Sequence, residues 1–503
     1  MSVSREINTT KNYTIVGGGF GGGLFNSING SLIPDNCLAD ISNLHIDHFG
    51  NLHSVAKPTE LATAYRAGTP ISSLMLTTHG VYCNQGGTLY KDGVVGTVWT
   101  VDPWMNATAE SPVGSNVAWV TQTEGLWVAG TNYSWAHSDF VTGQGIPSSR
   151  SIAEFEGRIW LDIGPILRGS DLYAPELEEA WRGPVDPVDL TTMTLGNCIL
   201  FTRVSSTIRQ LKKCRGMLFI FHDAGITTMT TFFGGTLRLA YNGPDVPRFG
   251  ASSPFRIYSD GNACYYASDN KFIAFDGATP TFISDRLSLP SAATFFAGEY
   301  DGRFWFLPCV DATPTGEEAN YLYSVDKTTG AWEKYDIQMT AKNGAVYDTP
   351  TCMAAGEDPI SSLTGNRLYM GTSLGKIWYL NPTSTNDPLA WSFTTKTYTP
   401  SFDAYSRFQH FKIRYVGQAA SSPVTIKQYV CRDGTATLQL TDTTSLNMQG
   451  AGMYQRDIEC HAELGEGVYF VINGTGTASI ADCGVEFTTK GAGDVNRIGG
   501  SGA

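Results

Sequence analysis

The sequence has few charged residues and no long apolar or helical run. Charged side chains make up 16% of its 503 residues, below the usual ~25%. No stretch reaches the ~18 consecutive apolar residues of a membrane-spanning helix, and no amphipathic pattern of helical period extends over the ~12 residues of a typical helix. Residues 1–13 are polar and lack the apolar core of a signal peptide. These absences argue against a helical fold and predict a chain without a membrane anchor, made in a cytoplasm.

Basic residues are also scarce relative to acidic ones. The chain has 34 Lys and Arg against 47 Asp and Glu, a net charge of −13. This balance argues against a groove that wraps nucleic acid by neutralising its phosphates. A wall along which DNA passes without sticking stays open. The basic cluster Lys212–Arg215 is interpreted as a solvated turn rather than a DNA-reading element.

None of the ten cysteines forms a CxxC pair. Most of them lie inside apolar stretches, where a thiol behaves as a small hydrophobic group. We therefore expect buried free thiols, as in a reducing compartment, with zinc or disulfide roles as the alternatives. The cysteines are Cys37, Cys83, Cys198, Cys214, Cys264, Cys309, Cys352, Cys431, Cys460 and Cys483.

What the sequence does have is glycine, aromatics and a repeated β-pattern. It contains 55 glycines, and aromatic residues make up 12%. Seven stretches, whose starts are about 30 to 65 residues apart, each combine a short alternating strand, a Gly/Asp/Asn turn and an aromatic-rich return strand. The stretches are Val81–Lys91, Leu126–His137, Gly157–Arg168, Arg215–Met229, Gly261–Gly277, Tyr300–Leu307 and Asn366–Leu380. A repeat of this length predicts an all-β chain built on a β-propeller of six to seven blades.

The propeller repeats are expected to occupy residues 59–385. Residues 1–58 read as a Gly-rich arm with a β-hairpin at Ile41–Val55, which is a candidate partner for the last blade. The pattern breaks at Asn381–Pro388, and residues 389–490 have longer strands that predict an antiparallel β-sandwich. Residues 491–503 form a Gly-rich tail that we expect to be flexible.

Gly17, Gly19 and Gly22 match the GxGxxG pattern of a dinucleotide-binding turn. That turn needs a following helix, whose N-terminus holds the pyrophosphate. Here Phe25–Pro34 contains Asn, Gly, Ser and Pro where the helix should be. We therefore expect a flexible or tightly packed glycine arm and no cofactor.

His45, Asp47 and His53 are the candidate metal ligands, since they could face one way across the N-terminal hairpin. A closed zinc site would need a fourth ligand, and ordinary hairpin roles are the preferred interpretation. We expect no metal site.

A glycosidase would need paired carboxylates near the propeller axis. Four acidic residues lie near predicted strand ends but in no distinctive motif: Asp162, Asp171, Glu176 and Asp301. No GxSxG nucleophile elbow occurs either. We expect no catalytic residues and no enzymatic activity.

Several segments resemble a family of phage virion proteins. The segments are Pro34–Leu52 after the glycine-rich opening, Gly157–Trp181 with its proline–acid–tryptophan end, Arg215–Met229, Phe255–Gly277, Asn320–Asp336 with its Gly-Ala-Trp unit, and the change of pattern at Trp391. In this order they resemble the tail nozzle or tail hub proteins of short-tailed bacteriophages, including the packaged-DNA-stabilisation type. At residues 269–271, Asp-Asn-Lys replaces the usual glycine turn of that family.

The resemblance implies a structural virion protein of the phage tail, synthesised in the host cytoplasm. Copies of the chain, most often six, would form a homo-oligomeric ring around the DNA channel below the portal and adaptor proteins. Tail fibre or needle proteins would be further partners. Double-stranded DNA would pass through the lumen without sequence recognition. The ring would retain packaged DNA and later allow its ejection.

Two other functions fit a propeller followed by a sandwich. One is a carbohydrate-binding adhesin or a glycosidase, which converging carboxylates and stacked aromatics at one propeller mouth would favour. The other is a cytoplasmic propeller scaffold that binds peptides and behaves as a monomer.

Overall fold

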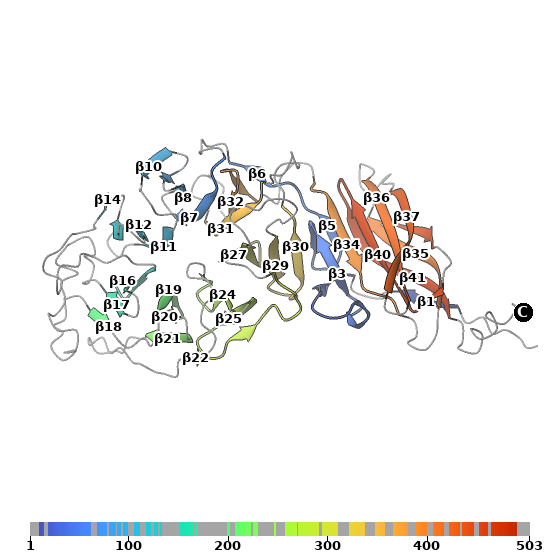
Figure 1. Cartoon of the computed structure of the whole chain (residues 1–503), viewed down its shortest axis with the longest axis horizontal. Helices are drawn as coiled ribbons and strands as arrows, with labels where there is room; N and C mark the ends of the chain where they lie inside the picture. The colour runs from blue at the N-terminus through green and yellow to red at the C-terminus, as the bar shows by residue number, and fades with distance from the viewer. Residues whose placement is uncertain are drawn as a thin grey trace, which may run out of the picture.

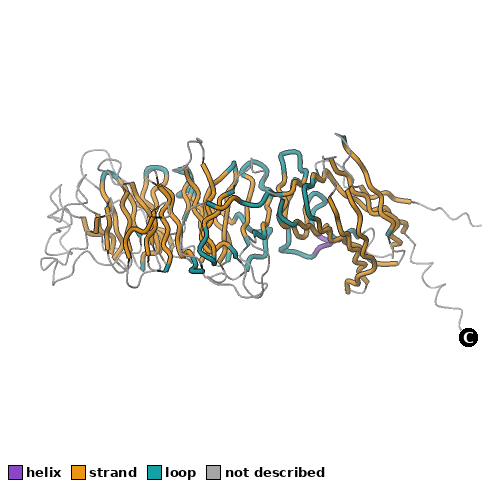
Figure 2. The backbone as a smooth tube through the Cα atoms, turned by 90° about the horizontal axis from the view of Figure 1, so that it is seen from above, coloured by secondary structure: helices purple, strands orange, loops and turns teal. Residues whose placement is uncertain are grey.

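The computed structural model is nearly all β-strand in the part of the chain that it describes (Figure 2). The described residues are 10–14, 19–61, 68–77, 80–86, 88–91, 94–98, 105–110, 117–121, 125–128, 131–132, 151–163, 166–169, 199–201, 207–222, 225–229, 246–247, 257–268, 270–290, 294–309, 321–337, 348–357, 366–380, 388–399, 406–416, 422–432, 435–446, 452–460 and 464–489. Among them, no helix is long and apolar enough to cross a membrane. The prediction of an all-β chain is confirmed.

Seven antiparallel units of four strands follow one another along the described chain. Unit 1 is β7 (Ile71–Thr77), β8 (Gly80–Gln85), β9 (Thr88–Lys91) and β10 (Val94–Val98). Unit 2 is β11 (Met105–Glu110), β12 (Val117–Thr121), β13 (Gly125–Val128) and β14 (Thr131–Asn132). Unit 3 is β15 (Ile152–Phe155), β16 (Arg158–Ile163), β17 (Ile166–Gly169) and β18 (Ile199–Phe201). Unit 4 is β19 (Ile208–Cys214), β20 (Met217–His222), β21 (Gly225–Met229) and β22 (Val246–Pro247).

The last three units complete the series. Unit 5 is β23 (Tyr258–Ser259), β24 (Cys264–Ser268), β25 (Lys271–Phe275) and β26 (Thr281–Phe282). Unit 6 is β27 (Thr294–Tyr300), β28 (Arg303–Cys309), β29 (Leu322–Asp326) and β30 (Trp332–Tyr335). Unit 7 is β31 (Pro350–Glu357), β32 (Asn366–Thr372), β33 (Ile377–Tyr379) and, from far earlier in the chain, β6 (Thr59–Glu60).

The first turn of a unit has the same backbone form in units 3, 4 and 6. Glu156, Arg215 and Asp301 have φ of 53°, 51° and 53°, and the glycine after each has φ of 69°. Two successive positive φ values define the tight turn that matches the twist of a β-hairpin, and glycine adopts the second at no steric cost. In unit 5 a different turn, between the second and third strands, has Asn270 (φ 57°) at its second position, a residue type that tolerates this conformation. The departure from glycine at this turn is therefore accommodated.

Tryptophan side chains repeat as well. The indole N–H of Trp160 donates to the carbonyl of Phe155 at 3.0 Å in unit 3, and that of Trp305 donates to the carbonyl of Tyr300 at 3.0 Å in unit 6. In each case the side chain reaches back over the tight turn to the end of the first strand, so a large buried aromatic keeps its polar group satisfied.

Apolar clusters lie between successive units. One cluster joins residues of units 3 and 4, another joins units 4 and 5, and a third joins units 1, 6 and 7. The first strand of each unit contacts the first strand of the next, from β7 to β31, and β31 contacts β7 in turn. The sequence favoured the N-terminal hairpin as partner of the last unit. Instead β6, just after that hairpin, pairs with β33, placing Glu60 opposite Trp378.

Two larger sheets, here called the end sheets, lie beyond unit 6 (right-hand part of Figure 1). The first contains β38 (Met453–Glu459), β35 (Ser406–Val416), β41 (Ser479–Thr489), β5 (Leu52–Ser54) and β4 (Leu44–Ile46), with β1 (Thr10–Thr14) and β39 (Leu464–Gly465) attached. The second continues from β30 through β2 (Gly23–Leu24), β3 (Cys37–Ser42), β34 (Trp391–Thr395), β40 (Gly467–Gly474) and β36 (Ser422–Arg432) to β37 (Thr435–Leu446). The four strands of unit 6 and the second end sheet therefore form one continuous ten-stranded sheet.

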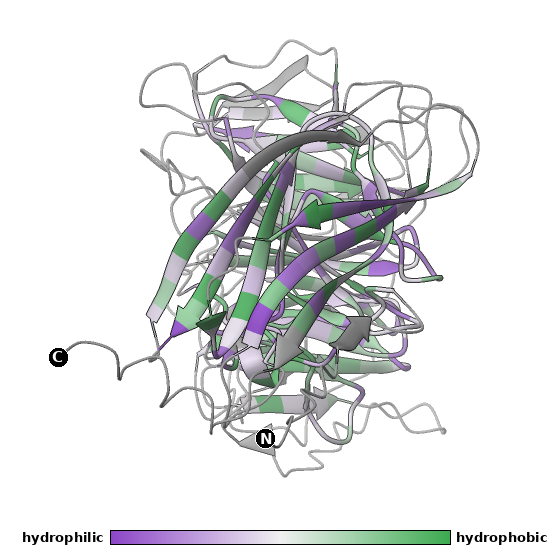
Figure 3. Ribbon diagram, turned by 90° about the vertical axis from the view of Figure 1, so that its right-hand side faces the viewer, coloured by the Kyte–Doolittle hydropathy of each residue, from purple (hydrophilic) through white to green (hydrophobic). Residues whose placement is uncertain are grey.

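The end sheets bury a common core. Along their long strands hydrophobic and hydrophilic residues alternate (Figure 3), the pattern of a sheet with one buried face. Phe411 of the first sheet stacks on Phe470 of the second with ring centroids 4.2 Å apart. The same apolar cluster includes Phe272 and Phe306, which belong to units 5 and 6. The core of the end sheets is thus continuous with the core of the nearest units.

The glycine-rich segment forms the seam between the two parts. β2 pairs in parallel with both β30 and β3. A Cβ atom on Gly23 would lie 2.5 Å from the backbone nitrogen of Trp332, and one on Gly22 would lie 2.3 Å from the sulfur of Cys37. The glycines are needed for close backbone approach. The GxGxxG reading required a helix here, but the next helical element is the three-residue η1 (Gly30–Leu32); Gly17 lies outside the described residues.

The predicted N-terminal hairpin exists as β4 and β5. It pairs with β41 of the first end sheet, so residues 19–54 are integrated into the end sheets rather than forming a separate arm. Of the predicted break at Asn381–Pro388, residues 381–387 lie outside the described residues, as does the tail 491–503.

Candidate functional site

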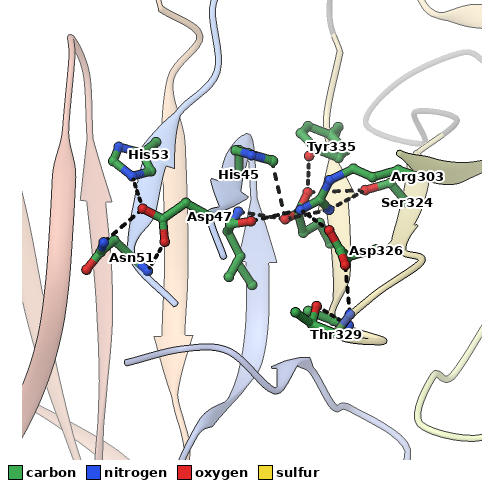
Figure 4. A network of polar contacts seen from close by, with 12 residues as sticks. His45, Asp47, Asn51, His53, Arg303, Ser324, Asp326, Thr329 and Tyr335 are labelled. Carbon is green, nitrogen blue, oxygen red and sulfur yellow. Dashed lines mark hydrogen bonds and ion pairs between the residues drawn. The ribbon is translucent and has the colours of Figure 1, made fainter. Parts of the chain in front are cut away.

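A buried polar joint lies where the N-terminal hairpin meets unit 6 (Figure 4). Its centre is Glu333 on β30, whose side chain is 0% exposed, paired with Arg303 on β28, whose side chain is 4% exposed. The Arg303 Nη1 lies 2.7 Å from the Glu333 Oε1. Charges taken out of water need such pairing together with further hydrogen bonds.

Every side of this ion pair is hydrogen-bonded. The backbone N–H of Ile46 donates to Glu333 Oε1 at 2.6 Å, and the Ser324 hydroxyl donates to Oε2 at 3.1 Å. The hydroxyl of Tyr335 donates to the same Oε2. Arg303 Nη2 donates to the carbonyl of Ile46 at 2.8 Å. The backbone of Ile46 thus donates to Glu333 through its N–H and accepts from Arg303 through its C=O, and these two bonds hold the hairpin on unit 6.

Electrostatics keep the central acid ionised. Burial raises the pKa of Glu333, but the neighbouring His45, Arg303 and Tyr335 outweigh it, so the pKa lies below its ordinary value. Burial and the negative charge of Glu333 raise the pKa of Tyr335 well above its ordinary value, so the phenol stays a donor. The pair is therefore charged across the physiological pH range.

The hairpin turn next to the joint is organised by Asp47. Its carboxylate accepts hydrogen bonds from the backbone N–H groups of Phe49 and Asn51, both at 2.8 Å, and lies 2.9 Å from His53 Nε2. Burial opposes ionisation, but the bonds from His53 and Asn51 prevail and lower the pKa of Asp47 to about 2. An acid that caps its own turn in this way stabilises the hairpin through contacts within the hairpin alone.

A cavity of about 220 Å³ opens beside the joint. Its polar lining includes His45, His53, Asp301 and Arg303, and its apolar wall includes Trp305. Its size suits a few water molecules or a small polar molecule rather than the usual ~300–1,000 Å³ of a ligand site.

The candidate metal ligands divide between two partners. His45 and His53 lie opposite each other on β4 and β5, but His45 Nδ1 faces Glu333 Oε1 at 3.6 Å while His53 bonds Asp47. Within the described residues, no group of three His, Cys, Asp or Glu side chains is placed to hold a metal ion. The histidines therefore belong to the polar joint.

The candidate carboxylates do not converge. Asp301 sits in the turn between the first and second strands of unit 6, while Asp162 lies near the end of the second strand of unit 3, opposite Leu167 of the third. In an antiparallel meander these are opposite ends of the unit. Asp162 instead accepts the backbone N–H of Ser151 at 2.6 Å. Asp171 and Glu176 lie outside the described residues.

The basic cluster is occupied by contacts between units. Lys213 Nζ lies 2.8 Å from Glu154 Oε2 of unit 3, and Arg215 Nη1 donates to the carbonyl of Asp276 of unit 5 at 2.8 Å. The interpretation as a turn rather than a DNA-reading element agrees with these contacts.

Sequence reasoning did not find Arg303 and Glu333. The signal was present, since each is a charge between aromatic residues of a strand, in Gly302-Arg-Phe-Trp-Phe306 and Ala331-Trp-Glu-Lys-Tyr335. A charge at such a position requires a buried partner, but only the fold brings the two strands to the hairpin.

No family model matches the sequence, and no curated protein matches it either. Among solved structures, the chain is similar to the extracellular domain of a protein described as a hybrid two-component system, from B. thetaiotaomicron (11% identity, TM-score 0.42, 86% of this chain and 62% of that one). It is also similar to Sqt1 of Saccharomyces cerevisiae (6%, 0.35, 65% and 100%) and to an exo-beta-1,3-galactanase of Phanerochaete chrysosporium (12%, 0.24, 70% and 99%). These identities and TM-scores support no statement about activity or partners.

Proposed function

We propose that the seven units are the blades of one β-propeller and that the end sheets form a β-sandwich joined to it. The support is the chain of contacts from β7 to β31 and back to β7, together with β6 completing the last unit from the start of the chain. Closing a ring of blades with a strand from the other end of the repeat removes the exposed edge that an open array would leave. In this proposal the propeller occupies 59–385 and the sandwich 389–490, with strands from residues 1–58 added to it.

The chain is, in this proposal, a structural protein of a short-tailed phage tail, the nozzle or hub. Copies form a ring, most often of six, below the portal and adaptor and next to tail fibre or needle proteins. The ring retains packaged DNA in the virion and allows its ejection, with no catalysis and no cofactor. The net charge of −13 suits a lumen to which the DNA backbone does not adhere.

The observation that carries the proposal is that four of the six family-like segments come together around the joint and the sheet that contains it. Pro34–Leu52 supplies β3 and β4, Asn320–Asp336 supplies β29 and β30, and the strand beginning at Trp391 pairs with β3. Phe272, from the segment Phe255–Gly277, stacks on Trp332 with centroids 5.9 Å apart. Segments that are far apart in the sequence and resemble one family thus build one structural element.

This element suits a channel wall under load. The ten-stranded sheet passes without a break from unit 6 into the end sheets, and the Arg303–Glu333 pair fixes the hairpin across the same seam. A continuous hydrogen-bonded sheet transmits force between two parts better than a flexible linker does. Each copy would act as one stiff piece.

The test uses DNA-filled heads assembled without this chain. Nuclease sensitivity of the packaged DNA is measured before and after adding the purified protein, with heat-unfolded protein as the control. Leaking heads that the folded protein makes nuclease-resistant would support the role in retention. Heads that hold their DNA without the protein would overturn it, and would make binding of the protein to glycans the next measurement.

A further inference from the structure

The last strand of the ten-stranded sheet has one open side. β37 lies at the end of that sheet away from the units (Figure 1) and pairs on one side with β36. Among the described residues, no strand pairs with its other side. Within this part of the chain, the backbone N–H and C=O groups that face outward from β37 therefore have no partner strand. Such an edge is a template on which a further strand can be added.

This edge has little protection against the addition of a strand. Native proteins usually protect an edge with charged side chains, proline or a bulge. β38, the outer strand of the first end sheet, carries Arg456, Asp457 and Glu459, and all three are exposed. β37 has one charged residue, Asp442, and neither proline nor lysine. Its pairing with β36 skips Gln439, which forms a bulge.

An apolar row leads to the open edge on the outer face of the sheet. Leu438 lies opposite Tyr429, and Tyr429 lies opposite Tyr469. The two tyrosine rings stack with centroids 4.9 Å apart and planes 3° from parallel. Val430 and Phe470, the next residues along the two strands, belong to the core, so the row lies on the opposite face. Leu438 ends the row and is 46% exposed.

The partner that fits this edge best is a second copy of the same strand. Each copy has a net charge of −13, so two copies repel each other least where the surface is uncharged, as it is along Thr435–Thr441. In an antiparallel pairing centred on Leu438, that residue lies opposite Leu438 of the second copy, and Thr435 lies opposite Thr441. Apolar pairs and threonine pairs directly opposite each other stabilise a sheet. The apolar rows of the two copies then meet at the centre of the contact.

We propose that two copies of this chain associate through β37, by antiparallel pairing about a two-fold axis at Leu438. The ten-stranded sheet of one copy then continues into that of the other. Each copy uses the same edge, so the contact closes on itself and leaves no open edge at β37. The pairing of Thr435–Thr441 is smaller than the roughly 20–30 residues a side of a standard interface, so association should depend on protein concentration. This contact does not depend on the function proposed above.

Hydrogen exchange of the folded full-length protein tests the pairing directly. In a single copy, the β37 amides that do not bond β36 face water and exchange fast, whereas in a pair they are bonded to the second copy. The peptide that covers Thr435–Thr441 should therefore retain more slowly exchanging amides at about 100 µM than at about 1 µM protein. The peptide that covers β38 is the internal reference and should exchange equally at both concentrations.

Charge variants at the two-fold axis make the test specific. Leu438→Lys or Leu438→Glu places two like charges opposite each other and should weaken association at least about tenfold. A mixture of the two variants brings opposite charges together, so the slow exchange of Thr435–Thr441 should return. The matched control is Met453→Lys, the same kind of change at a residue of β38 that is 61% exposed, and it should leave the exchange of β37 unchanged. An unchanged melting temperature shows that each variant is folded.

Exchange of Thr435–Thr441 that is as fast in the unmodified protein as in Leu438→Lys would overturn the proposal. The comparison with this variant also covers a pair too tight to dissociate at about 1 µM. Slow exchange that is lost in both Leu438 variants but does not return in their mixture would also overturn it, because the edge would then bind a different surface. Loss of slow exchange in Met453→Lys would show that any added positive charge has this effect, and would contradict a contact at Leu438.

Discussion

Replacing Glu333 with Gln tests whether the joint holds the hairpin on unit 6. Glutamine keeps only one acceptor oxygen, which can serve either the Ile46 N–H at the Oε1 position or the Ser324 and Tyr335 hydroxyls at the Oε2 position, and it removes the charge. Arg303, 4% exposed, is then left buried without its closest counter-ion. Removing one partner of a buried ion pair costs about 3–5 kcal/mol.

Hydrogen exchange measures this loss locally. The Ile46 amide donates to Glu333, so its exchange reports opening of the joint. At about 1.4 kcal/mol per tenfold change, the expected fall in protection is roughly 100-fold to several thousand-fold. The matched control is Glu60→Gln, which removes the exposed ion pair with Lys376 (side chains 44% and 37% exposed). Surface pairs of this kind contribute at most about 1 kcal/mol.

A double variant separates charge from shape. In Arg303→Met with Glu333→Gln neither charge of the central pair is left, and Asp326, which loses its contact with Arg303, is 25% exposed to water, so part of the protection lost in Glu333→Gln should return. If the double variant exchanges faster than the single one, the buried charge is not the cause of the instability. Unchanged exchange in Glu333→Gln would refute the clamp itself.

Three further predictions concern acid, the seam and the last unit. The folded pKa values of Glu333 and Asp47 lie below their ordinary values. The contribution of these two carboxylates to the free energy of unfolding is therefore complete above about pH 5 and is lost as the pH falls toward about 2. The urea midpoint of unfolding should fall over this pH range, and should fall less in Glu333→Gln. Gly23→Ala should lower the melting temperature by several degrees more than Gly68→Ala. Both glycines have positive φ (70° and 78°), but only at Gly23 would a Cβ meet another backbone, while at Gly68 it would meet nothing within 4 Å. Leu61→Pro removes the N–H that donates to Ile377 at 2.8 Å, and should speed hydrogen exchange in β33 by roughly tenfold or more; unchanged exchange there would mean that β6 does not hold the unit.

The sequence predicted the all-β class and the tight turns because these depend on local patterns. Arg215–Gly216 and Asp301–Gly302 can be predicted as turns from the sequence, since their backbone conformation depends on little beyond the two residues themselves. The hairpin around Asp47 could be predicted from the sequence for the same reason.

The sequence could not predict the joint, because the residues that form it are far apart in the sequence. Glu333 and Ile46 meet only after β2 has been inserted between β30 and β3. Glycines in that segment matched a nucleotide-binding pattern because both uses need a backbone without side chains. A nucleotide-binding turn and a close contact between strands differ in what approaches the glycine backbone. Here it is the backbone of Trp332 on another strand, and no local sequence pattern predicts that contact.

The insertion of β2 also constrains when the molecule can become complete during synthesis. β2 is made early, yet its partners β30 and β3 enclose it only once residue 332 exists, and β3 in turn pairs with β34 beyond residue 390. The units can form in order as the chain emerges, because their contacts are local. β2 can pair with β3 and β4 with β5 at once, but β3 must wait for nearly four-fifths of the sequence before its other partner β34 exists. Assembly of the whole molecule is therefore expected to be slow and to finish only after synthesis ends.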